Sequence, residues 1–317
     1  MLINTLLLTA GLLLLIKGAD WLVEGASAVA KKKRVSDLAI GLTIVAFGTS
    51  APELVVTVMA SVEDQQDIVF GNIIGSNNFN LFFILGIAGL ITPLVVQSST
   101  IYKEIPISLL AAILLFVLAN SFISGDNLIS RGDAIILLVL FAGFLFYVYR
   151  QLKLEPEKAE IKQTEMGVAK IWIFIVLGLA GLVIGGRLVV NSAVDMATAW
   201  GVSEQLIGLT IVAMGTSLPE LATTVVAAVK KKTDIAVGNI IGSNIFNIFF
   251  ILGVSAMVRP IPYDNIFNTD LYLLFGGTVF LFMAMFMAGK KKLDRWEAGI
   301  LLAAYLIYTI WLITKEI

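Results

Sequence analysis

Two stretches of the chain recur almost unchanged at a separation of 167 residues. Residues 40–53 match residues 207–220 at twelve of fourteen positions, and residues 67–86 match residues 234–253 at sixteen of twenty. Accidental similarity between hydrophobic segments does not explain so many identities at one offset. The chain therefore contains two related halves, and its fold has to give both copies equivalent surroundings.

The composition indicates a membrane protein, because 58% of the 317 residues are hydrophobic and only 14% are charged. Ten apolar runs are long enough to cross a bilayer. They cover approximately residues 2–28, 37–60, 68–91, 101–120, 131–150, 169–197, 204–229, 234–258, 268–288 and 295–314. No Lys or Arg precedes the first run, so we expect a retained span there. The prediction is an all-α membrane protein with ten transmembrane helices.

The spans divide equally between the two halves. Residues 1–150 and 169–317 hold five each, and a charged linker at 151–168 joins them. An odd number of spans forces the second copy to begin on the opposite side of the membrane. We therefore expect two inverted five-helix repeats, an arrangement common in secondary transporters, which bind their substrate between the repeats near the midplane.

The basic residues are distributed unevenly between the loops. Seventeen of the 22 Lys and Arg lie in the loops after the first, third, fifth, seventh and ninth spans, against three on the other side. Cytoplasmic loops carry an excess of Lys and Arg. The sequence therefore predicts a cell-membrane protein with a cytoplasmic linker and both termini outside the cytoplasm.

Each copy of the first repeated motif ends in Pro-Glu within an apolar run. Pro52 cannot donate a backbone hydrogen bond to the carbonyl of Gly48, and Pro219 cannot donate to Gly215. Both helices should therefore kink or open here. Irregular backbone at membrane depth is tolerated where it is buried in protein or lines a cavity, and freed carbonyls there can bind cations.

Glu53 and Glu220 occupy equivalent positions four residues after Thr49 and Thr216, so each hydroxyl and carboxylate share a helix face. A carboxylate at the bilayer centre costs about 2.5–3.5 kcal/mol and usually faces a pathway or a partner. The two glutamates should meet near the pseudo-twofold axis and hold a cation between them. A protonated glutamate in a helix interface is the structural alternative.

The second repeated motif carries polar residues at four-residue spacing in each half. These stripes are Asn72, Ser76 and Asn80, and Asn239, Ser243 and Asn247. We interpret the serines and the last asparagine of each stripe as ligands or near-ligands, and the glycines as packing residues. Asn77, Asn78 and Asn244 stay ambiguous. The chain has no Cys and no His, and oxygen-only ligands favour hard cations such as Ca²⁺ or Na⁺, with H⁺, K⁺ and other divalent ions left open.

These motifs, GTSxPE and GNxxGSNxxN once per half, resemble the paired alpha repeats of the calcium/cation antiporter superfamily, in particular the compact prokaryotic sodium/calcium exchangers. The resemblance implies that Glu53, Glu220, Thr49 and Thr216 form a central calcium site. It also implies roles for eight further positions. Flanking sodium sites would use the carbonyls of Ala46 and Ala213 with Ser76 and Ser243, Asn80 and Asn247 would border the middle of the site, and Ser50 and Ser217 would line the ion passages.

The potassium-dependent branch of this superfamily carries Asp where this chain has Asn247. The resemblance therefore implies Ca²⁺/Na⁺ exchange by alternating access, without a requirement for potassium. A Ca²⁺/H⁺ antiporter of the same superfamily is the main alternative, and an ion channel or a membrane enzyme is less favoured. We expect no enzymatic activity, no cofactor and no nucleic-acid partner, and a monomer that functions in the lipid bilayer.

Overall fold

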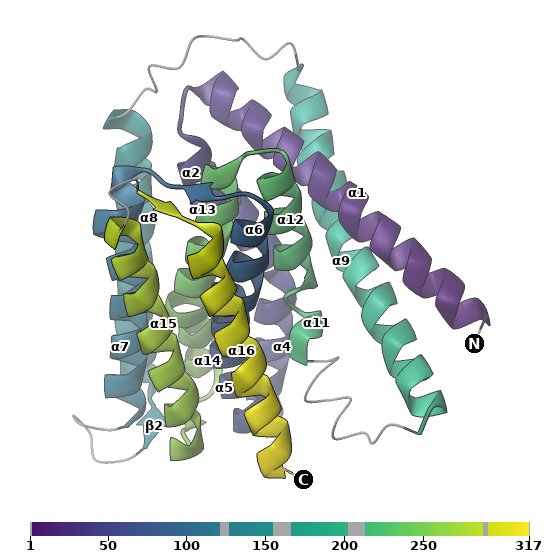
Figure 1. Cartoon of the computed structure of the whole chain (residues 1–317). Helices are drawn as coiled ribbons and strands as arrows, with labels where there is room; N and C mark the ends of the chain where they lie inside the picture. Colours follow the sequence, from purple (N-terminus) through teal and green to yellow (C-terminus); the bar gives the residue numbers. More distant parts are fainter. Residues whose placement is uncertain (1, 121–126, 155–165, 202–212, 288–290, 317) are drawn as a thin grey trace.

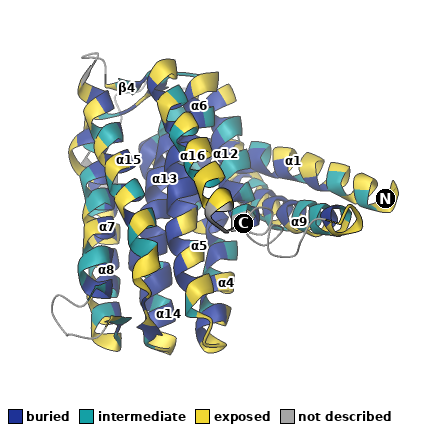
Figure 2. Cartoon of the chain, turned by 60° about the horizontal axis from the view of Figure 1, so that its bottom comes forward, coloured by how far each residue is buried: buried dark blue, intermediate teal, exposed yellow. Residues whose placement is uncertain are grey.

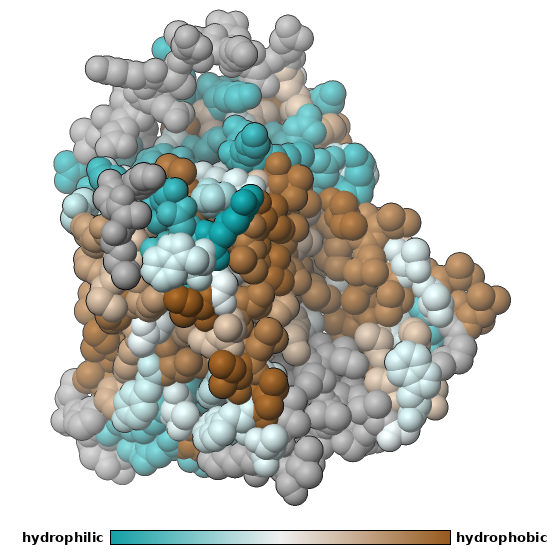
Figure 3. Space-filling view, in the orientation of Figure 1, coloured by the Kyte–Doolittle hydropathy of each residue, from teal (hydrophilic) through white to brown (hydrophobic). Residues whose placement is uncertain are grey.

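The structure, a computed structural model, describes residues 2–120, 127–154, 166–201, 213–287 and 291–316. Helices dominate these residues, as the hydrophobic runs predict. Figure 3 shows hydrophobic side chains in a band across the middle of one face, with hydrophilic side chains above and below it. Such a band is the surface expected of a protein that crosses a lipid bilayer.

The helices of the described chain fall into two series. The first series is α1 (Leu2–Lys33), α2 (Asp37–Ile40), the π-helical turn η1 (Gly41–Val45), α3 (Ala46–Thr49), α4 (Ala51–Val62), α5 (Gln66–Asn78), the π-helical turn η2 (Phe79–Ile84), α6 (Leu85–Ile91), the π-helical turn η3 (Thr100–Glu104), α7 (Ile105–Ala119) and α8 (Arg131–Leu154). The second is α9 (Val168–Ala199), α11 (Ala213–Gly215), α12 (Leu218–Val229), α13 (Thr233–Ile245), the π-helical turn η5 (Phe246–Ile251), α14 (Leu252–Val258), the 3-10 turn η6 (Asn265–Phe267), α15 (Asn268–Met287) and α16 (Arg295–Glu316).

Four consecutive elements of the first series have counterparts in the second. The bounds of α4, α5, η2 and α6 recur 167 residues later as those of α12, α13, η5 and α14. The repeated sequence therefore folds into the same local structure twice, including a π-helical turn after each polar stripe. The segments Gln66–Ile91 and Thr233–Val258 are the most buried of the long apolar helices, and Figure 2 shows α13 almost wholly buried while α15 and α16 expose one face.

The long helices α1 and α9 cross each other beside the bundle and pack together along much of their length (Figure 1). Glycines allow the close approach. A Cβ atom at Gly18 would lie 2.8 Å from the carbonyl oxygen of Gly178, and one at Gly11 would lie 2.9 Å from that of Gly185. Small residues of this kind let membrane helices approach backbone to backbone.

Two short antiparallel ribbons join the halves, a feature that an all-helical prediction does not contain. Strand β1 (Leu94–Val95) pairs with β4 (Lys292–Leu293), and β2 (Leu128–Ile129) pairs with β3 (Ile261–Pro262). Each ribbon therefore contains one strand from each half of the chain.

Seven helices in the described part of the chain are long and apolar enough to cross a membrane, or eight when the bent pair Asp37–Thr49 and Ala51–Val62 counts as one span. The sequence predicts ten. The start of the predicted span 204–229 lies outside the described residues, and its described helix α12 is 12 residues long. The last predicted span corresponds to α16, a helix of 22 residues.

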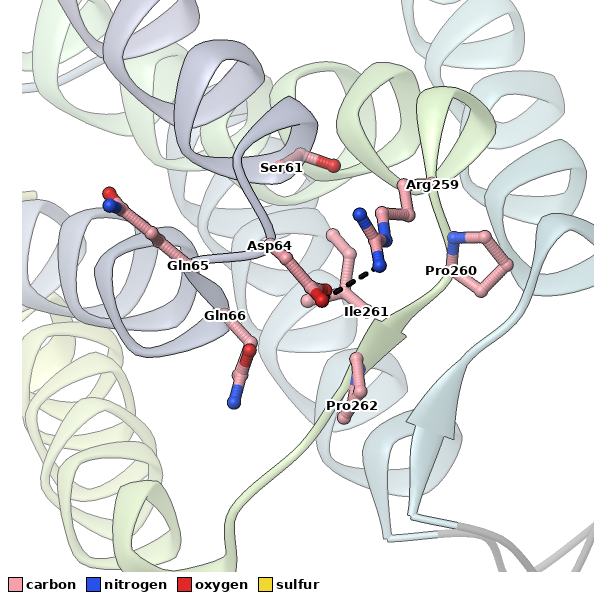
Figure 4. Close-up of a pocket in the computed structure, with 8 residues that line it drawn as sticks. All are labelled: Ser61, Asp64, Gln65, Gln66, Arg259, Pro260, Ile261 and Pro262. Atoms are coloured by element: carbon pink, nitrogen blue, oxygen red, sulfur yellow. Dashed lines mark hydrogen bonds and ion pairs between the residues drawn. The ribbon is translucent and has the colours of Figure 1, made fainter.

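A small surface pocket lies where the α4–α5 connection meets the segment that follows α14 (Figure 4). Its lining residues are Ser61, Asp64, Gln65, Gln66, Arg259, Pro260, Ile261 and Pro262. Asp64 and Arg259 form an ion pair of 2.7 Å, and both side chains are about half exposed. An exposed pair of this kind contributes at most about 1 kcal/mol to stability.

Candidate ion-binding site

Both Pro-Glu motifs interrupt their helices where the sequence predicts. Ser50 separates α3 from α4, and the helical segments on its two sides meet at 48°. In the second copy, α11 ends at Gly215 and α12 begins at Leu218. Each proline lies in the first turn of the new helix, where its missing N–H group leaves no hydrogen bond unmade.

The two breaks place one glutamate at the start of each new helix. Glu53 lies in the first turn of α4 and Glu220 in the first turn of α12. Their side chains are buried, with 2% and 0% of the surface exposed. The positive end of the helix dipole favours a carboxylate at such a position.

Each glutamate accepts a hydrogen bond from a serine of the opposite half. The hydroxyl of Ser217 donates to Oε1 of Glu53 over 2.9 Å, and the hydroxyl of Ser50 donates to Oε1 of Glu220 over 2.8 Å. These serines are the break residues themselves. The irregular backbone of each half thus provides the partner for the carboxylate of the other half.

The serines of the polar stripes join the same contacts. The hydroxyl oxygen of Ser243 lies 3.0 Å from that of Ser50, and the hydroxyl oxygen of Ser76 lies 3.1 Å from that of Ser217. Ser243 also lies 3.4 Å from Oε1 of Glu220, whereas Ser76 reaches Glu53 through Ser217. All four serines are buried.

Thr49 and Thr216 also reach across to the opposite half. The hydroxyl of Thr49 donates to Oδ1 of Asn239 over 3.1 Å, and the hydroxyl of Thr216 donates to Oδ1 of Asn72 over 3.2 Å. Sequence reasoning placed both asparagines in the polar stripes but gave them no partner. Their equivalent positions in the two copies of the motif were the only sequence feature that indicated a shared role for them.

The amides of these two asparagines are held at their other end by threonines of α4 and α12. Nδ2 of Asn72 donates to Oγ1 of Thr57 over 2.8 Å, and Nδ2 of Asn239 donates to Oγ1 of Thr224 over 3.0 Å. Thr57 and Thr224 were not singled out from the sequence. Each Nδ2 also donates to a backbone carbonyl, that of Glu53 over 3.4 Å and that of Glu220 over 3.5 Å, and these carbonyls fix the direction of the amides because they can only accept.

The carbonyl of Ala46, which was expected to be a sodium ligand, accepts a hydrogen bond in this structure. It receives the N–H of Ser50 over 3.0 Å, and the hydroxyl oxygen of Thr49 lies 3.3 Å from it. Ala213 is the first residue of α11. Asn78 turns away from the glutamates, since its Nδ2 donates to the carbonyl of Asp270 over 3.0 Å.

Asn80 and Asn247 lie one helical turn beyond the two stripe serines and are buried. Nδ2 of Asn80 donates to Oδ1 of Asn244 over 3.1 Å, and Nδ2 of Asn247 donates to Oδ1 of Asn77 over 2.9 Å. Asn77 and Asn244, two of the three asparagines that the sequence left ambiguous, therefore hold these amides from the opposite half.

Four buried oxygens in this cluster have no hydrogen-bond partner within the described protein. They are Oε2 of Glu53, Oε2 of Glu220, Oδ1 of Asn80 and Oδ1 of Asn247. None of the ion pairs among the described residues includes either glutamate. A buried polar atom without a partner is costly, and oxygens are the kind of ligand that a hard cation prefers.

The comparisons with known proteins agree with this geometry. The sequence matches the family described as "Sodium/calcium exchanger protein" over residues 3–150 and 170–314. It is 39% identical to the putative antiporter CaxA of Alkalimonas amylolytica, over 97% of this chain and 98% of that protein. It is 32% identical to the sodium/calcium exchanger MaX1 of Methanosarcina acetivorans, over 97% and 98%. The structure also superimposes on that of the sodium-calcium exchanger NCX_Mj, with a TM-score of 0.82, 31% identity and 97% of each chain covered.

Proposed function

The chain belongs to the sodium/calcium exchanger protein family, and on this basis we propose that it exchanges Ca²⁺ for Na⁺ across a cell membrane by alternating access, without a requirement for potassium. One observation supports the proposal most strongly. Two buried glutamates and two buried asparagines, one of each from either half, present four oxygens without protein partners. A divalent ion among these oxygens would balance both carboxylate charges, and two sodium ions would do the same.

The ligands we propose follow the two copies of the motifs. The central calcium site is assigned to Glu53, Glu220, Thr49 and Thr216, the sodium sites to Ala46, Ala213, Ser76 and Ser243, the middle border to Asn80 and Asn247, and the ion passages to Ser50 and Ser217. The hydrogen bonds of Ser50 and Ser217 to the glutamates support a position at the inner end of each passage. No cofactor belongs to this proposal.

The membrane arrangement we propose is ten spans in two inverted repeats, residues 1–150 and 169–317, joined by a cytoplasmic linker at 151–168. The matching helix bounds of the two series support the repeat, and the uneven distribution of Lys and Arg supports two external termini. We also propose a functional monomer, in which all of these ligands come from one chain.

Transport assays in proteoliposomes test the proposal. Vesicles loaded with Na⁺ and diluted into Na⁺-free medium should take up radioactive Ca²⁺, with or without K⁺ on either side. Uptake that follows an imposed pH gradient and ignores the Na⁺ gradient would identify a Ca²⁺/H⁺ antiporter instead. Uptake that needs both Na⁺ and K⁺ would contradict the assignment based on Asn247.

A further inference from the structure

The amide groups of Asn80 and Asn247 have two chemically different ends, and only one end suits a cation. An oxygen facing the site can bind a cation, whereas an NH₂ group there repels it. The two ends have nearly the same shape, so packing alone does not choose between them. Something else in the structure has to fix the orientation of each amide.

The orientation of Asn247 can be followed back to a backbone atom. Nδ2 of Asn77 donates to the carbonyl oxygen of Asn244 over 3.3 Å, and a carbonyl oxygen can only accept. Oδ1 of Asn77 is therefore the end that meets Asn247, where it accepts from Nδ2 over 2.9 Å. Oδ1 of Asn247 is left as the buried oxygen without a protein partner.

The same relay runs in the opposite direction for Asn80. Nδ2 of Asn244 donates to the carbonyl oxygen of Asn77 over 3.3 Å, which directs Oδ1 of Asn244 toward Asn80. Nδ2 of Asn80 donates to that oxygen over 3.1 Å, and Oδ1 of Asn80 is left without a protein partner. Two backbone carbonyls thus determine which atoms of two side chains are available to an ion.

We propose that Asn77 and Asn244 are positioning residues that hold the amides of Asn247 and Asn80 with their oxygens toward the transported ion. This inference rests on the proposed function and names two residues that enable cation binding without touching the cation. The reciprocal bonds to the two backbone carbonyls also join α5 to α13. A purely structural role in that helix contact is the competing explanation.

An aspartate separates the two explanations, because its carboxylate presents oxygen at both ends and needs no orientation. Asn77→Ala should weaken Ca²⁺ binding about tenfold, since a released Asn247 amide can turn its NH₂ group toward the ion. The same substitution in an Asn247→Asp background should change the Ca²⁺ dissociation constant less than about twofold. In an Asn80→Asp background, Asn77→Ala should again weaken Ca²⁺ binding about tenfold, because Asn77 orients Asn247 and not Asn80.

The equivalent experiment in the other half uses Asn244→Ala, which should also weaken Ca²⁺ binding. Asn80→Asp should restore binding in this variant, whereas Asn247→Asp should not, because Asn244 orients Asn80. Titration calorimetry of the purified full chain with Ca²⁺ gives the dissociation constants, and size-exclusion chromatography shows whether each variant is folded. The rescued and unrescued double variants contain the same alanine substitution, so any general loss of stability affects both equally.

Equal losses in both aspartate backgrounds would assign the two asparagines to helix packing and overturn the proposal. Failure of both alanine variants to fold in every background would have the same meaning. These results are distinct from a failure of the proposed function. In that case the unmodified chain would show no Na⁺-driven Ca²⁺ uptake, whatever the behaviour of the variants.

Discussion

Ser217 donates a hydrogen bond to Oε1 of Glu53 over 2.9 Å, although 164 residues separate them in the sequence. The equivalent bond from Ser50 to Glu220 spans 170 residues and 2.8 Å. Each half therefore completes the surroundings of the other half's carboxylate. A single half would hold a buried glutamate without the serine that accompanies it here.

Replacing Glu53 or Glu220 with glutamine should lower Ca²⁺ transport at least about tenfold while leaving the protein folded. Glutamine keeps the size of the side chain but removes one of two charges in a buried environment, where charge interactions exceed the roughly 1.4 kcal/mol of a tenfold change. Na⁺-driven uptake of radioactive Ca²⁺ into proteoliposomes measures the effect. Glu297→Gln is the matched control, because Glu297 is equally buried but accepts the N–H of Asp294 at the start of α16. Normal transport by either site variant would contradict the paired-carboxylate site.

Ser50→Ala and Ser217→Ala should weaken Ca²⁺ binding to a similar degree, by several-fold or more. Each variant removes a hydrogen bond to a charged group, and such bonds contribute about 1.5–3 kcal/mol. Calorimetric titration with Ca²⁺ gives the two changes. Ser61→Ala provides the comparison, since Ser61 is also buried but donates to the carbonyl of Ser255. A large effect of one serine variant with none of the other would show that the two halves do not contribute equivalently.

Gly18→Ala should destabilise the protein, because its new Cβ would lie 2.8 Å from backbone atoms of Gly178 and Leu182. Overpacking of this kind costs about 1–3 kcal/mol. Gly75 of α5 does not have the packing role that its motif predicts, since nothing lies within 4 Å of an added Cβ there. Gly75→Ala should therefore be neutral or stabilise the protein by up to about 1 kcal/mol. Thermal unfolding in detergent compares the two. Equal melting temperatures would indicate that α1 and α9 are less closely packed than the structure describes.

Cysteine labelling tests the membrane orientation. Asp64 and Lys231 occupy equivalent, exposed turns with φ of 63° and 57°, and the chain contains no other cysteine. An impermeant maleimide applied to intact cells should modify Asp64→Cys but not Lys231→Cys, and both should react after permeabilisation. The reverse pattern would invert the orientation, and reaction of both in intact cells would contradict inverted repeats. Asp64→Cys also removes the exposed ion pair with Arg259, which should lower the free energy of unfolding by at most about 1 kcal/mol.

The sequence predicted local features well, because they depend on nearby residues. Pro52 alone accounts for the helix break at Ser50, since a proline cannot continue the hydrogen-bond pattern of the preceding helix. The repeated motif likewise predicted that Glu53 and Glu220 would lie in matching positions. The described helices α4 and α12 place both glutamates in their first turns.

Contacts between distant residues were harder to predict. Nothing in the sequence near Asn72 identifies Thr216 as its partner, because that contact depends on how α5 packs against the opposite break. The amide orientation of Asn247 is harder still to predict. It depends on the side chain of Asn77 in α5, which is itself oriented by the backbone carbonyl of Asn244 in α13. Pairing between β1 and β4 was also missed, because strands of two residues leave no periodic pattern.

The two β ribbons restrict how the molecule can move. They lie at opposite ends of the helical bundle (Figure 1), and each joins the first half of the chain to the second. Because the two halves are joined at both ends of the bundle, a hinge motion that separates them at one end would have to break a ribbon. The α1–α9 pair contributes no strand to either ribbon and meets the bundle through packing against α12 and the ion pair between Asp20 and Lys230. For the exchange that we propose, the ribbons therefore favour motions that leave the two halves joined at both ends of the bundle.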